Sequence, residues 1–308
     1  MITTKPYFYD SFKCTADKCR DSCCIGWEID IDSKTYLRYK AEKGELGEKL
    51  RSNINNQSFI LTKDERCPFL EKNGLCELIC EKGEGYLCEI CREHPRYHEW
   101  YGKYHDVGLG LCCEEACRLL FHESKPLRFI TENDKSENEE EEDELILSLL
   151  SEREEIFNIL SDRTLPLSKR FETILDCNVV FDEIISVLED LEPFDKRWSE
   201  SFYYIKDNYM ELLSLKDNFL FHIGERVYEY ESLSLYLVHR YFVKSYNAYF
   251  TDSVLRGIAV YMGAQLLFDI YTYKNRGRFD FSDRIDTAKY ISKQIEYSEE
   301  NIDIIMNT

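Results

Sequence analysis

The sequence has few features of proteins that bind nucleic acid or membranes. Its 39 Lys and Arg residues stand against 59 Asp and Glu residues and give a formal net charge of −20, which disfavours contact with a phosphate backbone or with anionic lipid. The N-terminus lacks the apolar run of a signal peptide. The most apolar stretch, Gly257 to Phe268, lies between Arg256 and Asp269 and falls short of the roughly 20 residues that span a bilayer. We therefore expect a cytoplasmic protein with neither nucleic acid nor membrane as partner, and a core helix at this stretch.

Two cofactor signatures are also missing. A glycine-rich turn between a strand and a helix would indicate a dinucleotide-type site, but the nearest match, "GLGLCC" at 108–113, leads into cysteines. The CxxxCxxC signature of radical S-adenosylmethionine enzymes is incomplete, because Gly26, Gly83 and Leu120 occupy its third position after the three CxxxC pairs. Any cofactor must therefore bind in another kind of site.

Cysteine, in contrast, is abundant and concentrated. Twelve of the 13 cysteines lie between Cys14 and Cys117. A disulfide framework is not expected to persist in a reducing cytosol, so the cluster favours metal binding, with thiol redox chemistry as the second choice. Zinc and iron–sulfur clusters both use thiolate ligands. The isolated Cys177 is expected to pack as a small buried hydrophobic residue.

The cysteine spacing is irregular. Three pairs at i, i+4 spacing, 19/23, 76/80 and 113/117, would each project two thiols from one face if their segments are helical. Only Cys88 and Cys91 have the CxxC spacing of a zinc knuckle. The long-range spacing of the remainder favours an iron–sulfur cluster over a zinc ribbon.

Several sequence blocks resemble a known family. "FKCTADKCRDSCCIGWEIDID", "CPFLEKNGLCEL", "CREHPR" and "LGLCCEEACRLL", together with the C-terminal "YLVHRYFVKSY" and "ISKQIEYSEENIDII", resemble successive blocks of the flagellin lysine N-methylase family, whose cysteine-rich region is related to CxxCxxCC zinc- or iron-chelating domains. The resemblance implies a protein-lysine N-methyltransferase with S-adenosylmethionine as methyl donor and flagellin as substrate. It also implies a cysteine-ligated iron–sulfur cluster, 4Fe-4S, with zinc as the alternative.

The resemblance also implies a set of metal ligands. The cysteines at family positions are Cys14, Cys19, Cys23, Cys24, Cys67, Cys76, Cys91 and Cys113, whereas Cys80, Cys88, Cys112 and Cys117 are additions. Eight thiols exceed the four that one cluster normally takes, so either some are structural or a second metal binds. His94 and His98 are not expected to be ligands, and Arg96 has no assigned role. The sequence departs from the family where Tyr297, rather than histidine, follows Glu296; catalytic and cofactor-binding residues are not identified.

The chain is predicted to be mainly α with minor β, in two parts. Residues 1–130 form a cysteine-rich metal-binding domain, 131–144 an acidic linker, and 145–308 an all-helical domain. Predicted helices cover 145–160, 198–212, 233–249, 254–271 and 286–296, and predicted strands cover 27–31, 58–62 and a hairpin over 97–107.

Two other functions fit the same residues. A non-enzymatic zinc- or iron-chelating protein would use the thiols alone, and a thiol redox sensor would form reversible disulfides. The enzyme is favoured because the helical half carries its own family-like blocks, which a metal carrier does not need. Oligomeric state, target lysines and the choice between zinc and iron–sulfur stay open.

Overall fold

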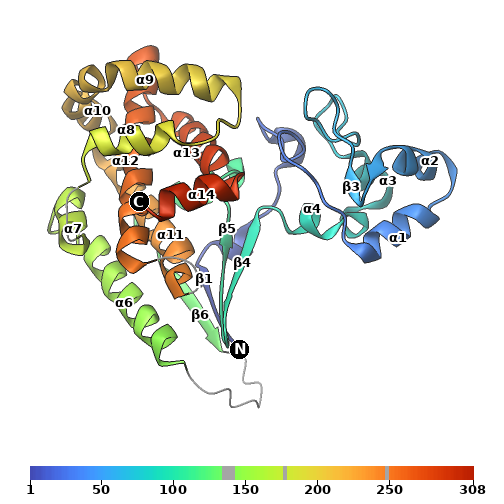
Figure 1. The fold of residues 1–308 in the computed structure, drawn as a ribbon, viewed down its shortest axis with the longest axis horizontal. Coiled ribbons are helices and arrows are strands. Elements are labelled where there is room, and N and C mark those ends of the chain that lie inside the picture. Colours follow the sequence, from blue (N-terminus) through green and yellow to red (C-terminus); the bar gives the residue numbers. More distant parts are fainter. Residues whose placement is uncertain (134–142, 176–178, 247–249) are drawn as a thin grey trace. The chain divides into compact units, whose positions relative to one another are not determined.

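The computed structural model describes residues 1–133, 143–175, 179–246 and 250–308 (Figure 1). It is 62% helical with 11% strand, which confirms the predicted mainly α fold with minor β. Cys177 and most of the predicted acidic linker, residues 134–142, lie outside the described residues.

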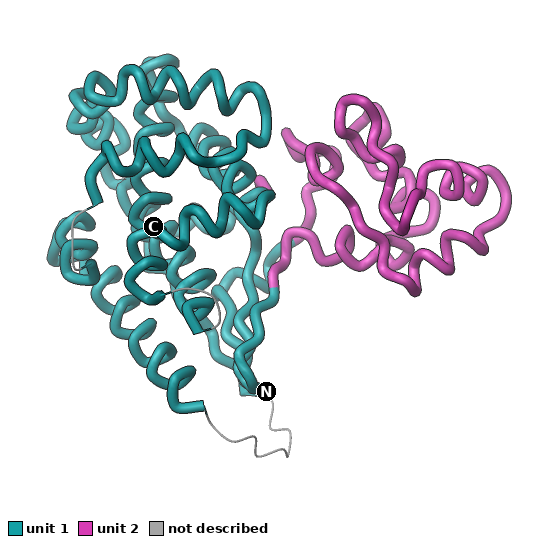
Figure 2. The backbone as a smooth tube through the Cα atoms, in the orientation of Figure 1, with its two compact units in different colours: residues 1–12, 98–112, 116–308 teal, residues 13–97, 113–115 magenta. Residues whose placement is uncertain are grey.

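The described chain divides into two compact units (Figure 2). The cysteine unit comprises Lys13–Tyr97 and Cys113–Glu115, and the helical unit comprises Met1–Phe12, His98–Cys112 and Ala116–Thr308. The units therefore do not follow the order of the sequence, since the first strand and a hairpin belong with the C-terminal helices. The linker predicted at 131–144 stays a prediction.

The cysteine unit is built from short elements. These are the 3₁₀ helices η2 (Ala16–Lys18) and η3 (Glu84–Tyr86), the α helices α1 (Ser33–Ala41), α2 (Gly44–Ser52), α3 (Glu77–Lys82) and α4 (Glu89–Glu93), and the two-stranded ribbon of β2 (Ile54–Asn55) and β3 (Ser58–Phe59). Their core includes Tyr39, Leu50 and Phe69, with Cys67 and Cys88 among the buried residues. The predicted strand over 27–31 is wrong, because the segment is irregular apart from an isolated bridge between Asp30 and Ser58. The strand predicted at 58–62 is limited to β3.

A four-stranded sheet lies in the order β4-β5-β1-β6. Its strands are β1 (Ile2–Pro6), β4 (Arg96–Tyr101), β5 (Tyr104–Leu109) and β6 (Phe129–Asn133), and η1 (Tyr9–Ser11) follows β1. The predicted hairpin is confirmed as β4 and β5. Strand β1 runs parallel to β5, with Thr4 opposite Asp106, and antiparallel to β6, with Thr4 opposite Thr131. The sheet thus joins segments far apart in the sequence.

The helices of the helical unit pack around α11 and α12. They are α5 (Glu114–Phe121, which begins in the cysteine unit), α6 (Glu144–Ser161), α7 (Leu167–Ile174), α8 (Phe181–Glu189), α9 (Lys196–Ser214), α10 (Lys216–Ile223), α11 (Tyr228–Tyr241), α12 (Thr251–Arg276), α13 (Phe281–Glu296) and α14 (Glu299–Met306), with the 3₁₀ helices η4 (Gly224–Val227) and η5 (Phe242–Tyr246). The predicted helices are confirmed, except that the one expected over 233–249 ends at Tyr241 and continues as η5, and its last residues, 247–249, lie outside the described residues.

Helix α12 is the core helix that the sequence predicts. It is long and apolar enough to pass a length and composition test for a membrane span, but 72% of its most apolar window is buried inside the structure, as in a core helix. Gly257 lets it approach α14 closely, since a Cβ atom there would lie 2.3 Å from the backbone oxygen of Ile305. Capping residues set the ends of its neighbour α13, which begins with a capping box of Asp280 and Asp283.

Helix α11 carries a buried histidine against the sheet. His239 is 1% exposed, its Nε2 lies 3.1 Å from the carbonyl oxygen of Val107 in β5, and its ring stacks on Phe129 at 4.4 Å. The neighbouring Arg153 and Asp106 form a buried ion pair. Burial lowers the pKa of His239 from 6.5 to about 4, because a charged imidazolium loses its hydration there.

We expect the stability of the helical unit to fall as the pH is lowered from 6.5 to 4. The unfolded chain binds a proton at His239 below pH 6.5, whereas the folded chain does so only near pH 4. The stabilisation is therefore complete above pH 6.5 and declines by about 3 kcal/mol on acidification to pH 4. Urea unfolding at several pH values measures it. His239→Gln can keep the donor to Val107 without titrating, so a variant with the same pH dependence as the wild type would contradict the assignment.

Candidate functional site

All eight predicted metal ligands lie in the cysteine unit, on loops and helix ends. Cys14 and Cys19 flank η2, Cys23 and Cys24 form a turn, Cys67 follows the β2–β3 ribbon, Cys76 caps α3, Cys91 lies in α4, and Cys113 immediately precedes α5. Segments separated by up to about a hundred positions in the sequence are thus folded into one unit. Whether these thiols bind a metal stays a prediction.

Cys24 is the centre of the group. Its sulfur interacts by hydrogen bonds with the thiols of Cys23 and Cys67. The backbone holds the same contact, because the amide of Cys67 donates to the carbonyl oxygen of Cys24 at 2.8 Å. The turn 23–24 and the segment at Cys67 are therefore fixed side by side.

Four further thiols lie within electrostatic range of this centre. Cys76 and Cys91 interact with Cys24 and Cys67, and Cys14 and Cys113 interact with Cys23. The structure thus brings Cys14, Cys23, Cys24, Cys67, Cys76, Cys91 and Cys113 into one connected group. Cys19 is half-buried at the end of η2, where its amide donates to the carbonyl oxygen of Ala16.

The hydrogen bonds divide the thiols into a donor and an acceptor class. The Cys23 and Cys67 thiols lower the pKa of Cys24 to about 3, with the Ser22 hydroxyl and the nearby His94 acting in the same direction. The same bonds, with burial, raise the pKa of Cys23 and of Cys67 above the ordinary thiol value. Cys24 is therefore the thiol of this group that loses its proton most readily, and a thiolate is the form that binds soft metals or attacks electrophiles.

The donor chemistry fits a metal site, but the thiols are hydrogen-bonded to one another. Thiolate sulfurs are the ligands of zinc and of iron–sulfur clusters. Within the described ranges, no group of three or more His, Cys, Asp or Glu side chains is arranged to hold a metal ion. Binding a metal would thus require these side chains to replace their mutual hydrogen bonds with bonds to the metal.

The ligand set implied by the family resemblance leaves out Cys88, which contacts one of the predicted ligands. Cys88, assigned as an addition, is buried and its sulfur interacts by a hydrogen bond with Cys91, which lowers the pKa of Cys88 and raises that of Cys91. The CxxC spacing in the sequence could have identified this residue. Cys88 caps the N-terminus of α4 and Cys91 lies in its first turn, so the two sulfurs meet. Cys80 is exposed, and Cys117 lies in the helical unit, where its sulfur donates to the carbonyl oxygen of Leu111 at 3.0 Å.

The helical condition for the i, i+4 pairs fails for 19/23 and holds at a helix start for 76/80. Cys19 and Cys23 are not in a helix, because the segment after η2 runs through bends and a turn. Cys76 caps α3, its carbonyl oxygen accepts from the Cys80 amide at 3.0 Å, and the two thiols lie within electrostatic range. Cys113 immediately precedes α5 and Cys117 lies in it.

Two contacts hold the 19–27 segment in place. The amide and Nε of Arg20 donate to Glu114 at 3.0 and 2.9 Å, which ties this segment to the residues after Cys113. Trp27 Nε1 donates to the carbonyl oxygen of Cys23 at 2.6 Å, and its ring lies 5.8 Å from that of His94. These residues orient the backbone that carries the thiols.

Comparison with known proteins gives a small set of relatives. Two proteins named lysine-N-methylase, from Salmonella typhimurium and Salmonella choleraesuis, are each 28% identical to the chain over 136 residues, which is 40% of this chain and 33% of each relative. A flagellar biosynthetic protein FliU of Salmonella muenchen is 27% identical over 136 residues, 79% of its length. Over this part of its length the chain is similar to proteins named lysine-N-methylase. The predicted resemblance to the flagellin lysine N-methylase family is thereby confirmed, and its cysteine motif stays a prediction.

The match to the lysine-N-methylases has limits. The aligned part of the chain spans about a third of the length of the two proteins with that name. No family model and no solved structure matches the chain. The word methylase is therefore the name of the relatives. Neither the cofactors nor the cysteine ligands of this chain follow from the match.

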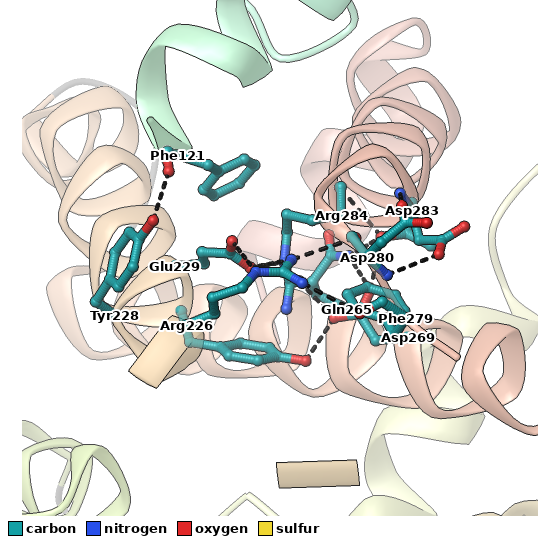
Figure 3. Close-up of polar contacts among 12 residues, drawn as sticks. Phe121, Arg226, Tyr228, Glu229, Gln265, Asp269, Phe279, Asp280, Asp283 and Arg284 are labelled. Carbon is teal, nitrogen blue, oxygen red and sulfur yellow. Dashed lines mark hydrogen bonds and ion pairs between the residues drawn. The ribbon is translucent and has the colours of Figure 1, made fainter. Parts of the chain in front are cut away.

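The helical unit also contains a large buried ion network (Figure 3). Arg284 of α13 is 0% exposed and donates to Glu229 of α11 at 2.9 Å and to Asp269 of α12 at 2.5 Å. Asp269 also accepts from Tyr230, Gln265 and Thr287, and Glu229 also accepts from Arg226. Every carboxylate oxygen of Glu229 and Asp269 thus has a donor, and the network joins three helices. Gln265 Oε1 and Arg284 Nη2 have no hydrogen-bond partner among the described residues.

The predicted non-ligands lie in two places. His94 is near Cys24 in the cysteine unit. His98 lies in the helical unit, where its Nδ1 is 3.0 Å from Nε2 of His105 on the hairpin. Arg96 begins β4.

Proposed function

We propose that the chain is a protein-lysine N-methyltransferase that transfers methyl groups from S-adenosylmethionine to lysines of flagellin. The observation that carries the proposal is the similarity to two proteins named lysine-N-methylase, with the FliU relative supporting a flagellar substrate. The net charge of −20 favours a substrate that presents cationic side chains. Cytoplasmic location belongs to the same proposal.

The reaction sets a chemical requirement on the site. The lysine ε-nitrogen attacks the methyl carbon, the carbon–sulfur bond breaks, and sulfur keeps the electron pair. The nitrogen must first lose a proton, since free lysine has a pKa near 10.4. A site that surrounds the amine with buried side chains and provides an acceptor for its proton meets this requirement.

The cysteine unit would hold the metal. We propose an iron–sulfur cluster, 4Fe-4S, with zinc as the alternative. The ligands would come from the predicted set, with Cys24, Cys23, Cys67 and Cys91 at its centre because their sulfurs interact directly or lie within electrostatic range. When bound, such a group supplies a rigid cross-link between loops and a Lewis acid.

A non-enzymatic metal-chelating protein is the second candidate. The concentration of thiols in one compact unit, separate from the helical unit, favours it. The chelating protein would bind metal and transfer no methyl group, so one experiment separates the two functions.

We expect anaerobically purified protein to contain stoichiometric metal and to methylate flagellin. Iron, sulfide and zinc analysis with an ultraviolet–visible spectrum measures the first property. Mass spectrometry of flagellin incubated with protein and S-adenosylmethionine measures the second, with omission of the methyl donor as control. Metal without methyl transfer to flagellin or to a lysine-rich test protein would favour the chelating protein and contradict the methyltransferase.

A further inference from the structure

A second group of polar side chains lies near the end of α13, and it contains an incompletely paired carboxylate. The Glu296 side chain is 3% exposed. Its Oε2 accepts from Ser292 at 3.0 Å and pairs with Arg240 of α11 at 3.2 Å. Its Oε1 has no hydrogen-bond partner among the described residues, and neither has the hydroxyl of Tyr261 on α12.

These two atoms belong to one group. Tyr261 is fully buried and interacts electrostatically with Glu296, Arg240 and Tyr241. Burial raises its pKa far above the ordinary value, so the phenol stays protonated. A buried carboxylate oxygen and a buried neutral hydroxyl thus lie in the same surroundings.

Aromatic rings surround the group. The Arg240 guanidinium lies 5.4 Å from the ring centroid of Tyr241 and donates to the hydroxyl of Tyr236 at 2.8 Å. Tyr297, next to Glu296, is half-buried and its ring meets Phe194 edge-on at 6.4 Å. Negative ring faces attract alkylammonium groups.

The exposure of the side chains increases outward. Tyr261 is 0% exposed, the Glu296 and Arg240 side chains are 3% and 14% exposed, and Tyr297 is half-buried. The group therefore extends from the core of the helical unit to its surface. A ligand reaching it would be a narrow chain that ends in a polar atom.

Physical chemistry restricts what that polar atom is. A buried acceptor without a partner destabilises the folded state, and native structures satisfy nearly all such groups. An anion would be repelled by the Glu296 carboxylate, and a methyl group would donate to neither oxygen. A primary ammonium has three N–H donors and can satisfy both Glu296 Oε1 and the Tyr261 hydroxyl oxygen.

We propose that Glu296, Tyr261 and the surrounding rings bind the primary ammonium at the end of an alkyl chain. Two molecules of the proposed reaction carry this chemistry, the substrate lysine and the α-ammonium of S-adenosylmethionine. The inference rests on the proposed function only for the choice of these two ligands. The binding itself requires no methyl transfer.

Binding measurements on the full chain test the site. Calorimetry gives the dissociation constants of S-adenosylmethionine and of a peptide with one lysine, for the wild type, Tyr261→Phe and Glu296→Gln. We expect one of these ligands to bind about tenfold more weakly to Tyr261→Phe and about 10–100-fold more weakly to Glu296→Gln. Matched controls are Tyr209→Phe and Glu211→Gln, whose side chains lie on the exposed surface of α9 and should leave both constants unchanged.

Ligands without the ammonium and a stability measurement complete the design. The Nε-acetyl-lysine peptide and 5′-methylthioadenosine lack it and should show no difference between wild type and variants. Tyr261→Phe removes a hydroxyl without a protein partner, so we expect its thermal midpoint to equal or exceed that of the wild type. Weaker ammonium binding with retained stability is a result that a structural role alone does not give.

The outcomes separate the site from the function. Weaker binding of only the peptide, or of only S-adenosylmethionine, supports the site and identifies the source of the ammonium. Unchanged constants in Tyr261→Phe, or no binding of either ligand to the wild type, overturn the site and indicate that water satisfies these atoms. Methyl transfer with unchanged constants overturns the site alone, whereas weakened ammonium binding without any methyl transfer overturns the proposed function alone.

Discussion

Replacing Arg284 with methionine is expected to lower the free energy of unfolding of the helical unit by about 3–5 kcal/mol. Arg284 is fully buried and pairs with both Glu229 and Asp269, which are also fully buried. Methionine fills much of the volume but carries no charge. Breaking a buried pair by removing one partner leaves the other charges without compensation, and Arg226 alone remains to neutralise the two carboxylates.

Urea unfolding monitored by circular dichroism measures the loss. The matched control is Arg278→Met, because Arg278 is exposed and lies 3.8 Å from its partner Asp280. An exposed pair at this distance contributes little, so we expect the control to lose less than about 1 kcal/mol. Equal losses in the two variants would show that the buried network does not stabilise the contact of α11, α12 and α13.

If the proposed metal binds, replacing Cys24 with serine is expected to remove most of it. Cys24 is the acceptor for the thiols of Cys23 and Cys67, which lower its pKa. Loss of a residue that merely supports a metal ligand costs about 10–100-fold in affinity, and loss of the ligand itself should cost at least as much. Metal analysis of protein purified in parallel with the wild type measures the change.

Cys80→Ser is the matched control for this variant. Cys80 is exposed on α3 and is absent from the predicted ligand set, so metal content should stay at the wild-type level. Full metal content in Cys24→Ser would remove Cys24 from the ligands. Equal loss in both variants would indicate that metal retention depends on the folding of α3 and not on the Cys24 sulfur.

The helices were predictable because their apolar periodicity is local. Trp198, Phe202, Ile205 and Leu212 recur at helical spacing and all four are buried on α9. Strands β1 and β6 were missed, since β1 is stabilised by pairing with residues near 104 and near 131. The sequence pattern of a five-residue strand does not show which distant segment the strand pairs with.

The candidate site was predictable in membership but not in geometry. The concentration of thiols identified the residues that meet in the cysteine unit. The choice of Cys24 as the thiol that loses its proton most readily depends on hydrogen bonds from two sulfurs, one of which is 43 positions away in the sequence. The unpaired oxygen of Glu296 could not be predicted at all, because it depends on which of the neighbouring side chains fail to reach it.

The path of the chain links metal binding to sheet formation through chain entropy. The cysteine unit is an excursion that leaves the helical unit after Phe12 and returns at His98, while β1 and β5 on either side of it are neighbours in one sheet. When the cysteine unit is unfolded, pairing β1 with β5 closes a long flexible loop. When the cysteine unit is folded, the same pairing closes a much shorter effective loop. Each halving of the effective loop length lowers the entropic cost by about 0.6 kcal/mol. A metal that folds the cysteine unit would thereby also stabilise the sheet of the helical unit.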